Sequence, residues 1–461
     1  MAEIGEKCAV FGIYGKNIDV SRLTFFGLFA LQHRGQEATG IATNDGGHIV
    51  LHKGSGLVSQ VFDEETIAGL TGHIALGHNR YSTSGSKDLK GAQPVYIEDV
   101  NIALVHNGNL PDTSALESFL TEHGTGSTDL NDSQMMAEAI AVYLREGKTL
   151  EESIKSAYPL FTGVFSLLLM NEHSLVAVRD SYGVRPLSMG SIGNAVVFSS
   201  ETCAFHPTGT TFVRDIEPGE MVVVDENGTR SVRIEKGSTH LDLFEFVYFA
   251  RPDSTLLGKS VYEVRKNLGV ELARECSVDA DVVIPVPDTS TPVALGYSNA
   301  SGIPFEMGLM KNRYIHRTFI QPEQATRETS VKMKLTPMPE IIRGKKIILI
   351  DDSIVRGTTS RALVQMVYEA GAKEIYFLVS SPPVKYPDFY GIDTPKQEKL
   401  LAAQMSIEEM KNYLGVERLC FLSLEGTIRA TDLPEQLFCT SCFTGIYPVD
   451  IGKKKEAIRN V

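Results

Sequence analysis

The stretch "KKIILIDDSIVRGTTSRALVQMV", Lys345–Val367, decides the fold of the C-terminal half. Four apolar residues, Ile347 to Ile350, run directly into the carboxylates of Asp351 and Asp352. An arginine, a glycine and three hydroxyl residues follow, and then a helical pattern begins. A short β-branched run that ends in charge predicts a strand buried on both faces, whose end carries the two carboxylates.

The start of the following helix is expected to bind phosphate. Gly357 lets backbone approach a ligand closely, and Thr358, Thr359 and Ser360 add hydroxyl donors. A helix N-terminus attracts phosphate through its unpaired N–H groups and partial positive charge. The two carboxylates suit sugar hydroxyls or a hard cation that bridges a diphosphate. A simple helix cap after an acidic turn is the alternative, and the stretch lacks the Gly-Lys-Ser/Thr signature of a Walker loop.

The bulk composition of the 461 residues excludes several classes of protein. Hydrophobic residues at 43% and charged residues at 22% are ordinary for a soluble globular protein. A net charge of −13 argues against a nucleic-acid partner. No apolar run is long enough to cross a membrane, and "MAEIGEK" lacks the apolar core of a secretory signal. Six cysteines in so long a chain do not make a disulfide framework, which favours a reducing cytoplasm.

The pattern of predicted strands and helices changes near residue 236. Residues 8–235 show many short strand-like runs with turn signals and a few helices, which predicts an α+β domain with packed sheets. Residues 236–461 alternate helical stretches with short β-branched runs, which predicts an α/β domain with a parallel sheet and a C-terminal extension. Ligands of such sheets bind at the carboxyl ends of the strands, where Asp351 and Asp352 are expected.

The stretch "IDDSIVRGTTS" resembles the phosphoribosyl-pyrophosphate (PRPP) binding motif of type I phosphoribosyltransferases. The resemblance implies that Asp351 and Asp352 hold the ribose hydroxyls, partly through Mg²⁺. Ser353 and the Arg356–Ser360 loop would bind the 5′-phosphate region. A second stretch, "VPDTSTP" at Val286–Pro292, is similar to the pyrophosphate loop of this family, and places Thr289 near the metal.

The stretch "KNRYIHRTFIQPEQATRETSVKMKL", residues 311–335, is basic, rich in hydroxyls and poor in core residues. These are the properties of a flexible lid over an anionic substrate, although an ordinary solvated loop is the alternative. The resemblance implies that this lid binds PRPP and that His316 stands where the family usually has glycine. The PRPP-binding lid residues are expected to be Lys311, Arg313, Tyr314 and Arg317.

Cys8 begins the first predicted strand, "KCAVFGIYG". A lone cysteine there is more often a small core residue. Four polar clusters at other strand ends change that interpretation, because together they resemble the glutaminase domain of N-terminal-nucleophile amidotransferases, which implies a four-layer αββα fold. The clusters are "LQHRGQEATGIA" (31–42), "GHNRYSTSG" (77–85), "LVHNGNL" (104–110) and "NDSQ" (131–134).

The glutaminase resemblance implies a role for each residue of this half. Residues 1–7 would be a propeptide, and the freed α-amino group of Cys8, with a reference pKa near 8, would be the base for the thiol. Asn107 and Gly108 would form the oxyanion hole. The residues expected to bind glutamine are Arg80, Thr83, Gly85 and Asp132. The alternative for Arg80 is a surface charge. The alternative for Asp132 is a helix cap, a position that either Asn131 or Asp132 could take.

Three histidines, His33, His78 and His106, lie close to the clusters and are expected to be structural rather than catalytic.

The order of the two halves resembles the glutamine phosphoribosylpyrophosphate amidotransferase family, which opens de novo purine synthesis. The implied reaction is glutamine + PRPP + water → 5-phosphoribosylamine + pyrophosphate + glutamate. Ammonia would pass inside the protein, with the lid around residues 314–324 as channel wall and Phe246–Ser254 near the domain junction. A homotetramer, inhibition by purine nucleotides and a cytoplasmic location are further implications.

Some members of that family hold a [4Fe–4S] cluster with four cysteines. Cys439 and Cys442 match two of them, whereas Asp242 and Asp388 stand at the other two positions. Because such clusters prefer thiolates, half of the usual ligand set is missing. A mixed-ligand zinc or iron site is an alternative, and a lone C-x-x-C is a weak signal. The remaining cysteines, Cys203, Cys276 and Cys420, are expected to be core residues.

Three other functions are weighed against this interpretation. A transcriptional regulator that senses PRPP would lack a glutaminase half and carry a DNA-binding domain, and nothing in the sequence resembles one. An aminosugar synthase could share the N-terminal half, but its isomerase domain has no use for a PRPP motif. An inactive paralogue is a third alternative, although every expected catalytic residue is present.

Overall fold

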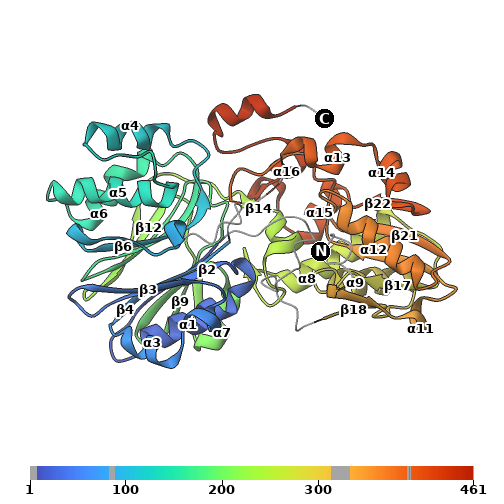
Figure 1. Ribbon diagram of the computed structural model, residues 1–461, viewed down its shortest axis with the longest axis horizontal. Helices are drawn as coiled ribbons and strands as arrows, with labels where there is room; N and C mark the ends of the chain where they lie inside the picture. The colour runs from blue at the N-terminus through green and yellow to red at the C-terminus, as the bar shows by residue number, and fades with distance from the viewer. Residues whose placement is uncertain (1–7, 82–88, 313–332, 392–393, 395, 460–461) are drawn as a thin grey trace.

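The computed structural model describes residues 8–81, 89–312, 333–391, 394 and 396–459. The chain forms two halves that lie side by side, with the N-terminal half coloured blue to green and the C-terminal half yellow to red in Figure 1. The end of the chain returns to the N-terminal half, since a Cβ on Gly452 would lie 2.9 Å from Asp112 Oδ2.

Two antiparallel sheets form the N-terminal half. Within the described residues, the first sheet has seven strands in the order β11-β9-β10-β1-β4-β2-β3 and the second has six in the order β13-β12-β8-β7-β6-β5. The first sheet contains β1 (Ala9–Tyr14), β2 (Ala38–Asn44), β3 (Ile49–Ser55), β4 (Ile74–Arg80), β9 (Ser188–Ile192), β10 (Ala195–Ser199) and β11 (Thr211–Asp215). The second contains β5 (Val95–Ile97), β6 (Ile102–Asn109), β7 (Val164–Met170), β8 (Leu175–Arg179), β12 (Glu220–Asp225) and β13 (Gly228–Arg233).

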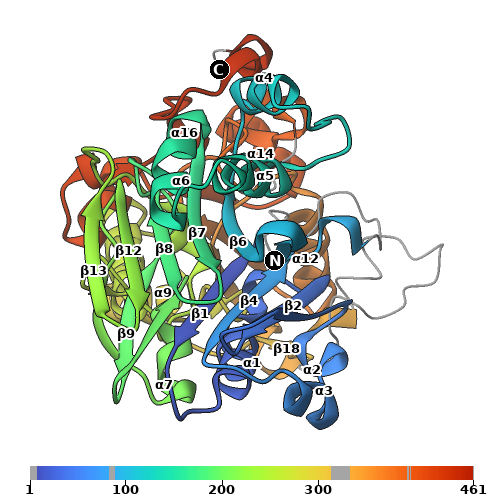
Figure 2. The ribbon, with the colours of Figure 1, turned by 90° about the vertical axis from the view of Figure 1, so that its left-hand side faces the viewer.

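The sheets pack face to face because both carry apolar side chains on their facing surfaces. Val10 and Leu76 of the first sheet meet Val105 and Leu168 of the second in one buried cluster. Helices cover the outer faces, so the order of layers is helix, sheet, sheet, helix (Figures 1 and 2). The predicted four-layer αββα fold is therefore confirmed. One outer layer contains α4 (Ser114–Glu122), α5 (Asp132–Arg145) and α6 (Leu150–Ala157), and the other α1 (Val20–Ala30), α2 (Val58–Val61), α3 (Glu64–Gly69) and α7 (Phe205–Thr208).

A parallel sheet forms the centre of the C-terminal half, as predicted. Its four described strands have the order β17-β20-β21-β22, and every neighbouring pair is parallel. The strands are β17 (Val282–Pro285), β20 (Lys346–Asp351), β21 (Glu374–Val379) and β22 (Arg418–Phe421). Buried clusters on the two faces join the sheet to α12 (Thr358–Glu369) and α14 (Ile407–Leu414) on one side, and to α8 (Val261–Glu275), α9 (Thr291–Ser301) and α15 (Leu424–Thr431) on the other.

A short π-helical turn, Glu245–Phe249, lies where the two halves meet. It belongs to a separate buried cluster that includes Phe244, Phe246 and Phe443. Smaller elements of this half are β14 (Leu241–Asp242), β15 (Thr255–Leu256), β16 (Lys259–Ser260), β18 (Leu309–Lys311), β19 (Leu335–Pro337), β23 (Phe438–Cys439), α11 (Pro339–Ile342), α13 (Leu401–Gln404) and α16 (Ser441–Thr444). Across the described residues, no helix is both long and apolar enough to span a membrane.

Cys276 and Cys420 pack in the core of the C-terminal half, as predicted. They are also bonded to each other as a disulfide across 144 residues, a pairing that the sequence did not predict. Cys276 ends α8 and Cys420 lies in β22, so the fold brings together residues that no sequence spacing connects. Cys203 is buried and free, as predicted.

Replacing both Cys276 and Cys420 by serine is expected to lower the melting temperature, because a cross-link over so long a loop stabilises by about 5 kcal/mol in the chain-entropy model. Calorimetry with and without reductant is the measurement. Reductant should lower the melting temperature of the wild type to that of the variant and leave the variant unchanged. Intact mass showing two free thiols at these positions in unreduced protein would contradict the disulfide.

Candidate active sites

The carboxyl edge of the parallel sheet carries the acidic pair. β20 ends at Asp351, and the side chains of Asp351 and Asp352 are 2% and 3% exposed. Ser353 Oγ donates to Asp352 Oδ1 (2.7 Å). The predicted pyrophosphate loop, Val286–Pro292, lies beside the end of β20, because Val286 N donates to Ile350 O (2.8 Å). The sheet thus brings together the two stretches that the sequence predicts to act on one ligand.

The electrostatics of the acidic pair favour a cation. Burial, and then the charge of Asp351, raises the pKa of Asp352 to about 7. Burial also raises the pKa of Asp351. Two adjacent buried carboxylates repel each other, and a divalent cation relieves that repulsion. Mg²⁺ commonly binds one or two protein carboxylates together with substrate phosphates, so these residues fit the ion. No group of three or more His, Cys, Asp or Glu in the described part of the chain is arranged to hold a metal alone.

The start of α12 has the form of a phosphate cradle. Its N-cap is Gly357, with φ of +74°. A Cβ at Gly357 would lie 2.5 Å from Leu401 Cδ2, so both conformation and space demand glycine. Arg356 Nε is buried and has no hydrogen-bond partner among the described residues. Ser360 is buried, and Thr358 and Thr359 are half-buried at the first turn.

The predicted pyrophosphate loop leads from β17 to α9. Thr289 is half-buried there, and Ser290 Oγ is buried with no hydrogen-bond partner within the described ranges. Lys311, the last residue of β18, pairs with Asp288 of this loop. The other predicted lid residues, Arg313, Tyr314 and Arg317, and also His316, lie outside the described residues.

A second polar edge lies in the N-terminal half around Cys8. The ladder between β1 and β4 pairs Ala9 with Asn79, so Cys8 and Arg80 lie at the same end of the sheet. Cys8 has φ of +58°, the left-handed region that side chains other than glycine rarely adopt. Arg34 Nε donates to Cys8 O (3.4 Å). Gly91 packs against the Arg80 guanidinium, since a Cβ there would lie 2.5 Å from Nη2.

The end of β6 lies beside the start of β1. Ser200 Oγ accepts from Val10 N (2.9 Å) and from Asn107 Nδ2 (3.4 Å), which joins the two sheets behind Cys8. Gly108 has φ of +154°, and a Cβ there would lie 2.0 Å from Val164 O. The fold therefore requires glycine at 108 and brings the predicted oxyanion residues next to the strand that Cys8 begins.

The N-terminus of α5 completes this edge. Asn131 is the N-cap, and Asp132 is the first residue of the helix. Asp132 Oδ2 accepts from Leu110 N (3.3 Å), which ties the helix start to the end of β6. The fold thus places Asp132 beside Asn107 and Gly108. Thr83 and Gly85 lie outside the described residues.

Hydrogen bonds hold the three histidines in place. His33 Nε2 bonds Glu201 Oε1 (2.8 Å), His78 Nε2 bonds His106 O (3.2 Å) and His106 Nδ1 bonds Ser133 Oγ (3.1 Å). Burial lowers the pKa of His78 to about 3, so its imidazole is neutral near pH 7. These contacts agree with the predicted structural role.

The residues at the predicted cluster positions lie together but do not fit a four-thiolate site. Asp242, Asp388, Cys439 and Cys442 are all buried. Burial raises the pKa of Asp242 to about 8, and burial together with the two carboxylates raises the pKa of both thiols. Carboxylates replace two of the thiolates that a [4Fe–4S] cluster prefers. Since none of the described residues gathers three such donors around a metal, the mixed-ligand alternative gains no support either.

Sequence reasoning missed a set of buried charges between the two halves. Arg34 and Glu201 lie near Cys8, whereas Glu245 begins the π-helical turn. Their separations of 167 and 211 residues leave no periodic signal. The only available signal was that Arg34 falls within one of the polar clusters at strand ends.

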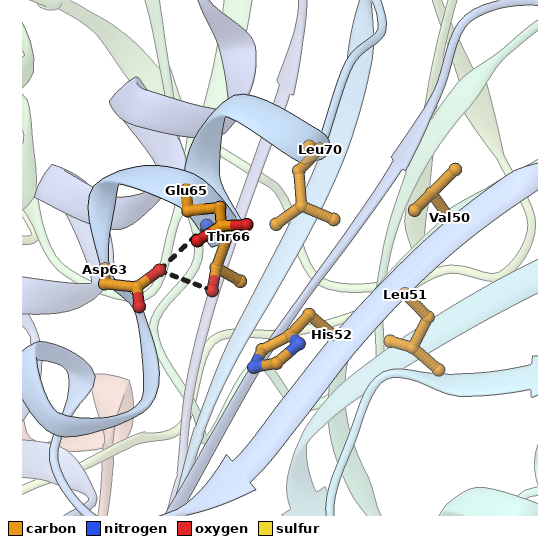
Figure 3. Close-up of a pocket in the computed structure, with 8 residues that line it drawn as sticks. Val50, Leu51, His52, Asp63, Glu65, Thr66 and Leu70 are labelled. Atoms are coloured by element: carbon orange, nitrogen blue, oxygen red, sulfur yellow. Dashed lines mark hydrogen bonds between the residues drawn. The ribbon is translucent and has the colours of Figure 1, made fainter.

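A surface pocket of about 320 Å³ lies between β3 and α3 (Figure 3). His52, Asp63 and Leu70 are among the residues that line it, and Asp63 accepts from Thr66 N and Oγ1 (2.8 and 2.7 Å). None of the predicted site residues lines this pocket. It carries no part of the chemistry considered above.

Comparison with known proteins identifies relatives of both halves. A glutamine amidotransferase domain family matches residues 78–207, and a phosphoribosyl transferase domain family matches residues 264–385. The amidophosphoribosyltransferase of Bacillus subtilis is 43% identical over 457 residues, covering 97% of this chain and 95% of its own. That of Synechococcus elongatus is 46% identical over 453 residues, covering 97% and 92%.

Solved structures agree with these matches. Glutamine PRPP amidotransferase from B. subtilis, complexed with ADP and GMP, superposes with a TM-score of 0.90 at 42% identity, covering 97% of this chain and 98% of that one. A structure of the allosteric regulatory enzyme of purine biosynthesis gives a TM-score of 0.91 at 42% identity, covering 97% of each chain. These relatives match both halves of the chain in the same order. The match excludes two of the alternative functions, a transcriptional regulator and an aminosugar synthase. The chain is a glutamine-dependent phosphoribosyltransferase and belongs to the amidophosphoribosyltransferase family.

Proposed function

We propose that this chain converts glutamine, PRPP and water to 5-phosphoribosylamine, pyrophosphate and glutamate, the step that commits PRPP to purine synthesis. The observation that carries the proposal is the buried Asp351–Asp352 pair beside the Gly357 helix start, in the same chain as the Cys8 edge. The Asp351–Asp352 edge suits a sugar diphosphate chelated to a metal ion, and the Cys8 edge suits an amide substrate.

The N-terminal edge would hydrolyse glutamine. The Cys8 thiol, deprotonated by its own α-amino group once residues 1–7 are removed, attacks the amide carbon and forms a thioester as ammonia leaves. Asn107 Nδ2 and Gly108 N–H donate to the oxyanion of the tetrahedral intermediate. Arg80 pairs with the α-carboxylate of glutamine and Asp132 with its ammonium, with Thr83 and Gly85 as supporting contacts. Water then releases glutamate and restores the thiol.

The C-terminal edge would bind PRPP and position its C1. Asp351, Asp352 and Thr289 hold Mg²⁺ and the ribose hydroxyls, while residues 353 and 356–360 donate to the 5′-phosphate. When bound, Mg²⁺ neutralises the charge on the departing pyrophosphate. Lys311 and the lid residues Arg313, Tyr314 and Arg317 close over the diphosphate. Ammonia forms the new C1–N bond as the C1–O bond to pyrophosphate breaks, and the adduct loses one proton.

Contacts at the junction support transfer of ammonia between the two halves. Asn109 Nδ2 donates to Phe389 O (2.7 Å). Gly391 lies close to Gly108, since a Cβ on Gly391 would be 3.4 Å from the carbonyl carbon of Gly108. A loop of the C-terminal half therefore lies against the oxyanion residues. The proposed channel wall at 314–324 falls outside the described residues.

The remaining parts of the proposal concern organisation. We infer a propeptide at 1–7, a glutaminase domain at 8–235 and a phosphoribosyltransferase domain at 236–461. A homotetramer, inhibition by purine nucleotides at the PRPP site and a cytoplasmic location are proposed by analogy with the family. The B. subtilis relative crystallised with ADP and GMP supports the choice of nucleotides.

Replacing Asp351 and Asp352 by asparagine should abolish phosphoribosylamine formation, because the cation and the ribose hydroxyls lose their charged ligands. Glutamate release in the absence of PRPP should stay near the wild-type rate. Both products are measured in the same reaction mixtures. Wild-type rates of phosphoribosylamine formation would contradict the role assigned to the pair.

Intact mass spectrometry of active protein should show loss of Met1–Lys7, because the proposed base is the amino group of Cys8 itself. A Cys8→Ala variant should release no glutamate and should still form phosphoribosylamine from added ammonia. Full glutaminase activity in a chain that retains all seven residues would exclude the amino group as base.

An Arg80→Lys variant should raise KM for glutamine by roughly 10–100-fold, because lysine cannot make the bidentate contact to the α-carboxylate. Steady-state kinetics measures the effect, with kcat expected to change less. Arg22→Lys is the matched control, since Arg22 pairs only with surface carboxylates of Asp19 and Glu64 among its described contacts. An unchanged KM in the Arg80 variant would refute its role.

A further inference from the structure

Four charged side chains are buried together where the two halves meet. Arg34, Arg185, Glu201 and Glu245 are between 0% and 2% exposed. Arg34 contacts both carboxylates: Nη1 donates to Glu201, and Nη1 and Nη2 donate to the two oxygens of Glu245 (3.0 and 2.7 Å). Arg185 Nη1 donates to Glu245 Oε1 (2.9 Å). Two positive and two negative groups balance, which satisfies the requirement that buried charges be paired.

Stability alone does not account for this arrangement. Buried ion pairs are often no more stable than apolar residues of the same volume, because desolvation offsets the attraction between the charges. The sheets and helices around the cluster already pack through apolar side chains. A network of this kind instead fixes the position of its members, and the groups to which those members are bonded indicate what is being positioned.

One end of the network holds the nucleophile. Arg34 Nε donates to Cys8 O (3.4 Å), so the guanidinium binds the backbone of the reacting residue and two carboxylates together. The carbonyl of Cys8 remains part of the chain after residues 1–7 are removed, so Arg34 can hold the backbone of the mature first residue. Glu245 fixes both terminal nitrogens of Arg34.

The other end lies in the C-terminal half. Glu245 begins the π-helical turn, and Arg265 of α8 binds the same turn through Nε to Phe246 O (2.9 Å) and Nη2 to Ala250 O (2.8 Å). Arg34 and Glu245 therefore connect the backbone of Cys8 to a turn that α8 of the C-terminal half holds in place.

We propose that Glu245 is a positioning residue for glutamine hydrolysis, which holds Arg34 against Cys8 O and makes the geometry of the thiol depend on the π-helical turn of the other half. The proposal rests on the proposed function. Glu245 touches neither glutamine nor PRPP; it acts through Arg34.

The test compares Glu245→Gln and Glu245→Asp with the control Glu220→Gln. Glu220 is a matched control, since it is also buried and accepts hydrogen bonds from both terminal nitrogens of Arg214 (2.8 and 2.7 Å). It differs from Glu245 in its place, because it lies in the second sheet, away from Cys8. Three rates are measured: glutamine hydrolysis, alkylation of Cys8 by a diazoketone analogue of glutamine, and phosphoribosylamine formation from ammonia.

Glu245→Gln should lower kcat for glutamine hydrolysis by about tenfold or more, because small misplacements of reacting atoms are costly. KM for glutamine should stay within about threefold, since Arg80 and Asp132 still bind the substrate. Alkylation should slow with kcat, and Glu245→Asp should recover part of each rate. Synthesis from ammonia should remain near the wild-type rate, and Glu220→Gln should match the wild type throughout.

Wild-type kcat and alkylation rates in folded Glu245→Gln would overturn the proposal, as would an equal loss of synthesis from ammonia in the folded variant, because Glu245 would then support both sites alike. Should that variant not fold, Glu245→Asp decides: reduced kcat with intact ammonia-dependent synthesis supports the proposal, and wild-type kcat overturns it. A wild-type protein that cannot use ammonia and PRPP would contradict the proposed function instead, and the alkylation rates would still decide the role of Glu245.

Discussion

The two halves of this protein are joined by charges from which water is excluded. Arg34 and Arg185 from the N-terminal half meet Glu245 from the start of the C-terminal half, at distances of 2.7–3.0 Å. Removing one partner of a buried pair costs about 3–5 kcal/mol, because the remaining charge is left unpaired in a medium of low dielectric. The halves therefore cannot separate or slide without loss, and each site keeps a fixed relation to the other.

That constraint matters because each active edge is built at the end of a strand. Cys8 immediately precedes β1, Gly108 lies near the end of β6, and Asp351 ends β20. A strand end can carry polar groups that its buried length cannot, and the rigid sheet behind it limits their movement. The junction then brings a loop of the C-terminal half, through Phe389, against Asn109.

The sequence reveals those parts of the site that are contiguous in the chain. Asp351 through Ser360 form one strand end, one glycine turn and one helix start, so periodicity and residue chemistry were enough to predict a phosphate site there. Cys8 and Asn107 required the resemblance to a family, because neither residue type is diagnostic alone. The four-layer packing of the N-terminal half followed from the same resemblance.

Contacts between distant residues could not be predicted. The partners of Arg34 lie 167 and 211 residues away, and Cys276 meets Cys420 across 144 residues. Only the folded sheets bring these groups within bonding distance, so no local pattern encodes them. Local patterns also left the N-cap of α5 open between Asn131 and Asp132, which the hydrogen bond from Gln134 N to Asn131 Oδ1 (2.9 Å) assigns to Asn131.

The central claim is that one chain releases ammonia at Cys8 and consumes it at Asp351 and Asp352 without mixing it with solvent. Isotope tracing tests this most directly: glutamine labelled with ¹⁵N in its amide is supplied with PRPP, Mg²⁺ and an excess of unlabelled ammonium at neutral pH, where most bulk ammonia is protonated. The account predicts phosphoribosylamine that carries mainly the label of glutamine. Product with the isotope ratio of the bulk solution would contradict it.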